Sequence, residues 1–219
     1  MKKYCIRTTL TLLLSMCAFT QSMAVEENEE NTATVPANRR VLVIGLDGNI
    51  KSNYYDPEML SEGTGIVKDS LCSVYNEVIE NNLAKAAGKE KSKFHFIPVQ
   101  MGEKDWKELT SNVTIKNDDE HSSSDWSKVN SAELRALMKK TPADYLLVLD
   151  THYLKYQEKP FKTVFHFINY SLYNDKKEKL TQGSSYFTSF APQSEKEMAN
   201  SSRKSSQKIV SDIVKTINK

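Results

Sequence analysis

The stretch "RRVLVIGLDGN", residues 39–49, is the first apolar run beyond the amino-terminal segment of the chain. Its apolar centre, residues 41–44, is rich in β-branched side chains and is typical of a strand that is covered on both faces. Asp47 and Gly48 follow, and this pair is typical of a turn in which the aspartate accepts hydrogen bonds from backbone N–H groups. The stretch therefore predicts a buried opening strand of an α/β domain.

Helical and extended patterns alternate along the rest of the chain. After a polar loop at 47–63, apolar residues recur near helical spacing, and Gly88 stands where such a helix would end. Three later runs rich in β-branched and aromatic residues are joined by short turns, as in an antiparallel meander. In chain order we predict a strand at 41–44, a helix at 64–88, a strand at 93–100, a helix at 131–140 capped by Ser131, strands at 143–156, 161–173 and 180–190, and a helix at about 194–218.

This order, β-α-β-α-β-β-β-α, predicts the fold class α/β, as an α+β sandwich. We expect a mixed sheet with an antiparallel C-terminal meander and with helices packed on it. The third predicted strand is expected to neighbour the first. One domain would span 39–219, with a polar insertion at 101–129 that is longer than most loops of compact domains.

The first 24 residues are typical of an export signal. Lys2, Lys3 and Arg7 form a basic start, a short apolar core follows, and Ala24 ends a site that a signal peptidase would cleave. Cys17 offers an alternative, because "LLSMC" resembles a lipoprotein box whose cysteine carries a lipid. We therefore predict an exported chain, periplasmic or outer-membrane associated in a Gram-negative bacterium. Cleavage after Ala24 is favoured, and a lipid anchor at Cys17 is the alternative and the one expected route to membrane contact.

Residues 25–38 are acidic and low in apolar residues, so we expect a flexible tether before the domain. Cys72 is the only cysteine outside the export segment, which excludes an internal disulfide. Removing the three basic residues of that segment leaves 27 basic against 28 acidic residues. With this balance and no dense basic face in the sequence, no nucleic-acid partner is expected.

A family of small bacterial envelope domains is similar to residues 39–219 in pattern and element order. The resemblance lies in "RVLVIGL", in a helix starting at Gly65, in "TPADYLLVLDTHY" and in "SRKSSQKIVSDIVKTI". The family contains the curli-secretion lipoprotein, the outer-membrane lipoprotein activators of penicillin-binding proteins, and the amino-terminal domain of the Tol-Pal translocation protein. The chain departs from it at "LDTHY", where the family usually continues into glycine. The resemblance implies binding rather than catalysis, since such domains dock on other envelope proteins or assemble with copies of themselves.

The main alternative is a metal-dependent hydrolase centred on three polar residues. "VLVIGLDG" resembles the opening strand of alkaline-phosphatase-like phosphodiesterases, in which the aspartate, here Asp47, is a metal ligand. Asp150 and His152 would project from one face of a strand, about 7 Å apart, a spacing that two metal ligands can share. Parallel first and third strands with aligned ends would bring all three residues together. The competing interpretation is a turn at Asp47 and a strand end that meets water.

Four aromatic residues stand in predicted loops: Tyr54 and Tyr55 before the first helix, and Trp106 and Trp126 in the polar insertion. Exposed loop aromatics are good anchors in protein interfaces, so these four form the predicted interaction surface. The two tyrosines could instead cover the end of the sheet as core residues. A carbohydrate or peptidoglycan ligand for the four rings is a further alternative.

His95 and His166 each lie between two phenylalanines, in the sequence "FHF". In a strand, alternation places the histidine on one face and the phenylalanines on the other. We expect both histidines to be exposed or half-buried on the sheet surface.

These patterns together predict an exported, non-enzymatic cell-envelope protein. We expect it to bind a protein partner or copies of itself, without catalytic residues, metal ligands or a cofactor.

Overall fold

The computed structural model describes residues 39–89, 93–99, 104–116 and 120–219. The predicted export segment, with Cys17, and the predicted tether lie outside these residues. The elements are β1 (Arg39–Gly45), β2 (Ile50–Ser52), α1 (Pro57–Thr64), the 3-10 helix η1 (Lys68–Ser70), α2 (Leu71–Lys89), β3 (Phe94–Pro98), α3 (Lys104–Thr110), β4 (Thr114–Lys116), β5 (Ser123–Asp125), α4 (Ser131–Lys140), β6 (Tyr145–Gln157), β7 (Thr163–Asn174), β8 (Lys179–Ser189), α5 (Glu195–Ser201) and α6 (Arg203–Ile217). None of the helices in these ranges is long and apolar enough to cross a membrane.

The central sheet has the strand order β3-β1-β6-β7-β8, and β2 also pairs with β6. β1 runs parallel to both β3 and β6, whereas β6, β7 and β8 are antiparallel neighbours. The predicted fold class, the mixed sheet with a C-terminal meander, and the pairing of the first strand with the third predicted strand are therefore confirmed.

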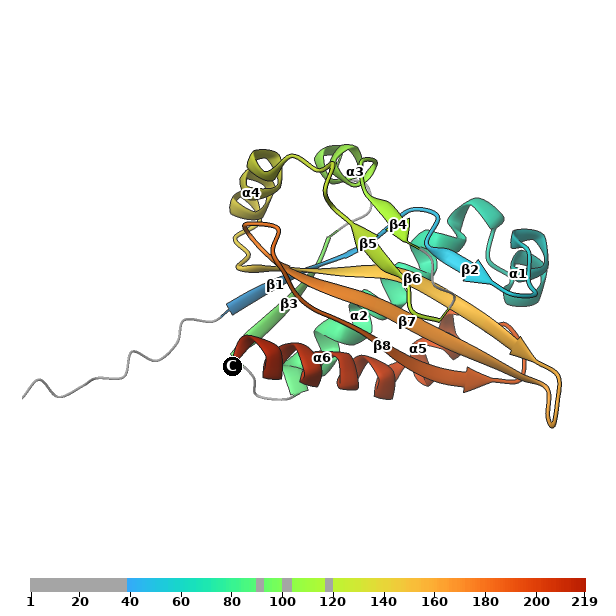
Figure 1. Cartoon of the computed structure of the whole chain (residues 1–219). Helices are drawn as coiled ribbons and strands as arrows, with labels where there is room; N and C mark the ends of the chain where they lie inside the picture. Colours follow the sequence, from blue (N-terminus) through green and yellow to red (C-terminus); the bar gives the residue numbers. More distant parts are fainter. Residues whose placement is uncertain (1–38, 90–92, 100–103, 117–119) are drawn as a thin grey trace, which may run out of the picture. The chain divides into compact units, whose positions relative to one another are not determined.

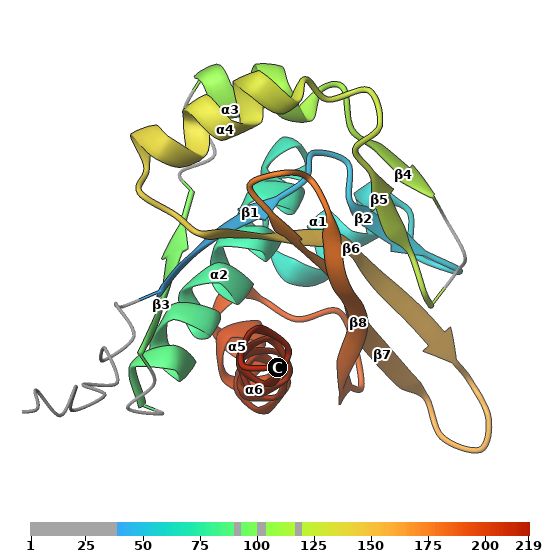
Figure 2. The ribbon, with the colours of Figure 1, turned by 60° about the vertical axis from the view of Figure 1, so that its left-hand side comes forward.

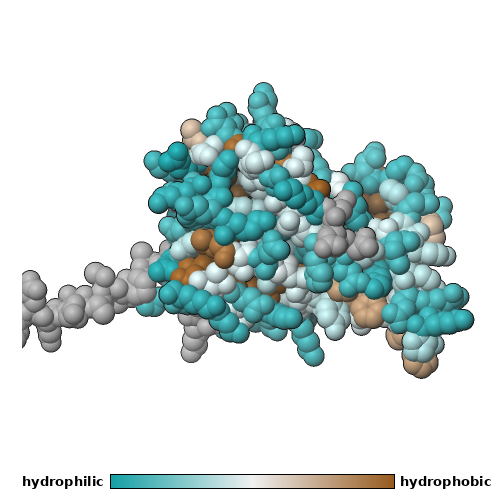
Figure 3. All heavy atoms as spheres, in the orientation of Figure 1, coloured by the Kyte–Doolittle hydropathy of each residue, from teal (hydrophilic) through white to brown (hydrophobic). Residues whose placement is uncertain are grey.

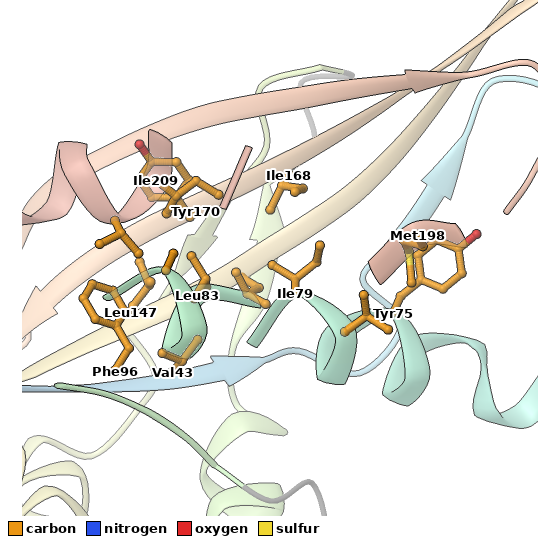
Figure 4. Packing of buried hydrophobic residues seen from close by; sticks show 14 of the residues in the cluster. Val43, Tyr75, Ile79, Leu83, Phe96, Leu147, Ile168, Tyr170, Met198 and Ile209 are labelled. Carbon is orange, nitrogen blue, oxygen red and sulfur yellow. The ribbon is translucent and has the colours of Figure 1, made fainter. Parts of the chain in front are cut away.

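One face of the sheet is covered by α2, α5 and α6 (Figures 1 and 2). In Figure 4, labelled apolar side chains from these helices lie against those from the strands. Ile79 and Leu83 of α2, Ile209 of α6, Val43 of β1 and Leu147 of β6 are all 0% exposed. Burying one such side chain contributes about 1.5–3 kcal/mol, so this layer supplies much of the stability of the fold.

The opposite face is covered only in part, by α3 and α4 (Figure 2). Leu42 of β1 and Leu146 and Val148 of β6 pack there against Leu134 and Met138 of α4. β1 is thus buried on both sides, as its apolar run predicts. The β6–β7 hairpin extends past both helical layers, which leaves part of the sheet without a helical cover (Figure 2).

The predicted loop at 47–63 contains two short elements, β2 and α1. The Asp56 carboxylate accepts a hydrogen bond from the Met59 N–H group at 2.8 Å and caps α1. Pro57 occupies the first turn, and Gly65 ends the helix in the left-handed region at φ 72°. An N-cap aspartate, a first-turn proline and a C-cap glycine are regular helix signals, so this element was visible in the sequence.

The other differences between the predicted and the observed elements also concern short elements and the ends of helices. The predicted polar insertion contains α3, β4 and β5. α4 is capped by Asn130, whose Oδ1 accepts from the Ala132 N–H group at 2.8 Å, and not by Ser131. The predicted C-terminal helix is divided at Ser202 into α5 and α6.

Candidate interaction surface

A β-bulge in β6 separates the two polar residues that were expected on one face. The pairing of β6 with β7 shifts register between Leu149 and Thr151. An extra residue in a strand reverses the side-chain alternation beyond it. Asp150 consequently contacts Ser124 of β5 on one side of the sheet, whereas His152 contacts Asn76 of α2 on the other. The predicted placement of Asp150 and His152 on the same face is wrong.

Asp150 of β6 is fully buried, and its carboxylate connects β5 to the sheet by hydrogen bonds. Its carboxylate accepts hydrogen bonds from the Ser124 N–H group at 3.1 Å and from the Ser171 hydroxyl at 2.6 Å. The hydroxyl of Tyr173 donates to the Ser124 carbonyl at 3.0 Å, and Trp126 Nε1 donates to the Ser124 hydroxyl at 2.9 Å. Burial raises the pKa of Asp150 to about 6, against the opposing effect of the two serines. Both described hydrogen bonds of the Asp150 carboxyl group join strands of the fold, so its role is structural.

His152 belongs to a buried polar cluster beneath α2. Its Nε2 lies 2.9 Å from Asn76 Oδ1, which also accepts from Asn49 Nδ2 at 2.8 Å. Because an amide oxygen only accepts, the imidazole carries its proton on Nε2. Burial lowers the pKa of His152 to about 3, so the ring is neutral at neutral pH. On the same helix, Glu80 accepts from the Gly45 N–H group at 2.9 Å, and burial raises the pKa of Glu80 to about 8.

Asp47 is exposed and takes part in the predicted turn with Gly48, whose φ is 66°. It lines a shallow groove of about 270 Å³ together with Lys107 of α3. Asp47 at the surface, Asp150 against β5 and His152 against α2 are not brought together. In the ranges that the structure describes, no group of three His, Cys, Asp or Glu side chains is placed to hold a metal ion. The hydrolase alternative therefore has no site built from its three predicted residues.

The two tryptophans of the predicted interaction surface are core residues. Trp106 and Trp126 are 2% and 4% exposed, and both belong to the apolar cluster between the sheet, α3 and α4. The short elements of the insertion have no core of their own, so they bury their largest side chains against the sheet. Trp106 and Trp126 cannot reach a partner at the surface, and that part of the prediction is corrected.

Tyr54 and Tyr55 follow β2 and cluster with Tyr156 of β6. The ring centroids of Tyr54 and Tyr156 lie 4.6 Å apart, and those of Tyr54 and Tyr55 lie 5.0 Å apart. Tyr54 is 56% exposed, whereas Tyr55 packs against the core, and burial raises the pKa of Tyr55. Tyr54 thus has the exposure that an anchor needs, and its role in binding stays a prediction.

A second group of rings occupies the sheet face opposite α2 and α6. Phe165 and Phe167 of β7, Tyr186 of β8 and Tyr153 of β6 form this group, termed the aromatic face. Neighbouring ring centroids lie 5.6 to 6.4 Å apart. Tyr186 is 56% exposed, the two phenylalanines are partly exposed, and Tyr153 is buried. At the lower right of Figure 3, near the free end of the β6–β7 hairpin, moderately hydrophobic residues in tan lie among hydrophilic residues in teal.

The aromatic face exists because the side chains of β7 face the opposite way from the expectation, which placed His166 on the sheet surface. His166, between the two phenylalanines, is the buried residue at 4% exposure, and its pKa is lowered by burial to about 4. Its Nε2 lies 2.8 Å from the Ser189 hydroxyl, and its ring stacks on Phe187 at 4.5 Å. Alternation then turns the phenylalanines toward solvent. In β3 the order is the expected one, with His95 exposed.

Comparison with known proteins finds only distant similarity to solved structures. No protein-family model matches the chain, and no curated protein matches it. The hypothetical protein CT253 from Chlamydia trachomatis is 11% identical, with a TM-score of 0.46 over 81% of this chain and 96% of that one. The LpoB C-terminal domain from Salmonella enterica is 11% identical, with a TM-score of 0.34 over 70% of this chain and 84% of that one. Lipoprotein GNA1162 from Neisseria meningitidis is 14% identical, with a TM-score of 0.33 over 82% and 98%.

A lipoprotein and the LpoB domain are therefore among the structures to which the chain is similar, at low sequence identity. These values assign neither a family nor a function to the chain. Membership of the predicted family of envelope domains stays a prediction.

Proposed function

We propose that the chain is an exported, non-enzymatic cell-envelope protein that binds another protein through the aromatic face, either a different envelope protein or a second copy of itself. The observation that carries this proposal is the set of partly exposed rings on a part of the sheet without helical cover. The basic and apolar start of the sequence supports export. The roles of Asp150 and His152 within the fold support binding over catalysis.

The aromatic face has the physical properties of an anchor. A phenylalanine or tyrosine buries about 150–250 Å² when it is fully covered, which makes aromatic rings effective in interfaces. Phe165, Phe167 and Tyr186 already contact one another, so they lose little rotamer freedom when a partner covers them. The backbone carbonyl of Tyr186 accepts a hydrogen bond from the Ser205 hydroxyl at 2.7 Å. Because α6 already satisfies this backbone group, contact through side chains is favoured there over addition of a strand to β8.

Further exposed rings lie at the same end of the sheet. Phe161, in the β6–β7 turn, is 75% exposed, and Phe190, directly after β8, is 87% exposed. Tyr54 also lies at this end of the sheet, because its ring packs on that of Tyr156 near the end of β6. Large exposed apolar patches mark interaction sites in soluble proteins, so these rings extend the surface available to a partner.

Photo-crosslinking from the aromatic face tests the proposal. We expect a photoreactive phenylalanine analogue at Tyr186 to give a discrete adduct in intact cells, since the ring would be covered by the partner. The adduct mass separates the two occupants: twice the mass of the processed chain indicates a second copy, and any other discrete mass indicates a different protein.

The matched control carries the same analogue at Val67, which is 70% exposed and distant in sequence from the sheet face. A Phe167→Ser change in the Tyr186 reporter should remove the adduct without changing the amount of protein. Equal labelling from positions 186 and 67, or an adduct that survives Phe167→Ser, would contradict the proposal.

Attachment to the membrane is a separate part of the proposal. A chain cleaved after Ala24 starts at Val25, whereas a lipidated chain starts at Cys17 and carries acyl groups. We expect the intact mass of the processed protein to match one of these two forms. A mass equal to the complete, uncleaved sequence would exclude both.

A further inference from the structure

A groove of about 350 Å³ lies between α2 and the α5–α6 pair. Three of its lining residues are cations: Lys85 and Lys89 from α2, and Arg203 from the first turn of α6. Two more, Asn82 and Gln207, are amides. The described lining contains no carboxylate, so the charge that this groove presents is positive.

The three cations have no carboxylate partner in the described part of the chain. Other lysines do have one: Lys116 pairs with Asp125 at 2.9 Å, and Lys140 pairs with Asp105. Lys85 and Lys89 are four residues apart on one helix, where like charges are neighbours and repel each other. An anion bound between them would relieve this repulsion.

The groove is held open by contacts that do not involve the cations. Asn82 Nδ2 donates to the Ala199 carbonyl at 2.8 Å and to the Ser202 hydroxyl at 2.9 Å, which fixes α2 against the junction of α5 and α6. Ala86 and Ala199 line the groove with small side chains that leave space between the charged ones. The site therefore exists before a ligand arrives.

A guanidinium group offers a planar pair of N–H donors, and each ammonium group offers a point charge with three donors. This combination suits a tetrahedral oxyanion with several charged oxygens better than a single carboxylate. We infer that the groove between α2 and α6 binds a phosphate-bearing anion, either the headgroup of a phospholipid or a soluble phosphate compound. The groove lies on the helix-covered side of the sheet, opposite the aromatic face, so this inference does not depend on the proposed function.

Binding assays with matched charge variants test the inference. The groove variant is Lys85→Gln, Lys89→Gln and Arg203→Gln; the control variant is Lys204→Gln, Lys208→Gln and Lys215→Gln. Both remove three positive charges from exposed side chains, but the control residues on α6 are not among those that line the groove. Each protein, from residue 25 onward, is assayed with inorganic phosphate and pyrophosphate by calorimetry. It is also assayed by flotation with phosphatidylglycerol–phosphatidylcholine vesicles and with phosphatidylcholine vesicles alone.

We expect the groove variant to lose about tenfold or more in affinity, and the control variant to lose about threefold or less, because only the first loses direct contacts to the anion. Binding to phosphatidylglycerol vesicles alone identifies a lipid headgroup, and binding to the soluble anions identifies a soluble ligand. Equal losses in the two variants would indicate general surface charge and overturn the inference. The inference would also be overturned if the wild-type chain bound none of the anions or vesicles. The single variant Arg203→Gln repeats the test if the triple variant unfolds at a lower temperature.

Discussion

Replacing Gly45 by alanine is expected to destabilise the fold severely. A methyl group at this position would lie 2.0 Å from Cγ and 2.5 Å from Cβ of Asn76. Contacts this short are overlaps, and the Asn76 Cβ belongs to α2, so rotating the side chain cannot relieve them. α2 must therefore move away from β1, and the amide of Asn76 moves with it.

This displacement of α2 disrupts the buried polar cluster. Asn76 Oδ1 accepts from Asn49 Nδ2 and from His152 Nε2, so moving it leaves one buried N–H group on each of these residues without an acceptor. The Leu149 carbonyl still accepts from Asn49 Nδ2 at 3.2 Å. Each unsatisfied buried group costs about 1–3 kcal/mol, and overpacking a core adds about 1–3 kcal/mol. Two such groups and the overpacking together give an expected loss of about 3–9 kcal/mol, which is comparable to the whole stability of a typical domain. Urea unfolding followed by circular dichroism measures it.

Gly88→Ala is the matched control. Gly88 lies near the end of α2, and a methyl group there would meet no atom within 4 Å. Alanine favours a helix over glycine by up to about 1 kcal/mol, so this variant should be as stable as the wild type or more so. Removing the clash by combining Gly45→Ala with Asn76→Gly should leave the cluster broken and restore only part of the stability. If the free energy of unfolding of Gly45→Ala lay within about 1 kcal/mol of the wild-type value, the close packing of β1 on α2 would not be essential for stability.

The elements that the sequence predicts well are those whose signal is local. The apolar run of β1, the helical spacing of α2 and the long runs of β6 and β7 each identify an element without knowledge of its neighbours. The order of these elements then predicts the mixed sheet and places β1 beside β6, whereas the parallel direction of these two strands is seen only in their pairing.

The candidate surface was hard to predict because it depends on contacts between distant segments. The alternation in "FHF" shows that His166 and its neighbours face opposite ways, but not which side the helices cover. The buried side is set by packing of β7 with Phe187 and the helices. The bulge at Asp150 has a similar origin: it is visible only in the pairing with β7. Trp106 and Trp126 lie in a polar segment whose docking onto the sheet has no local pattern.

Glu80→Gln is expected to change how stability depends on pH. The Glu80 side chain is 3% exposed on α2, and the described contact of its carboxyl group is the hydrogen bond from the Gly45 N–H group. Burial, the largest cause, raises its pKa from an ordinary 4.5 to about 8. A carboxyl group that holds its proton more tightly in the folded chain contributes stability below its unfolded pKa, and that contribution is lost as pH rises toward the folded pKa. The window is therefore about pH 4.5 to 8.

One pKa unit corresponds to 1.36 kcal/mol, so from pH 5 to pH 9 the wild type should lose about 4 kcal/mol relative to Glu80→Gln, which has no proton to release there. Other buried groups also titrate. His152 and His166, with lowered pKa values of about 3 and about 4, destabilise the fold as pH falls below about 6.5, but they are present in both proteins and cancel in the difference. Urea unfolding at pH 5, 7 and 9 measures how the stability of the wild type and of Glu80→Gln depends on pH. The control is Glu133→Gln, which removes an exposed carboxylate from α4 and should show the same pH dependence as the wild type. Parallel curves for Glu80→Gln and the wild type would mean that the Glu80 carboxylate is solvated in the folded chain and that the cluster beneath α2 is open to water.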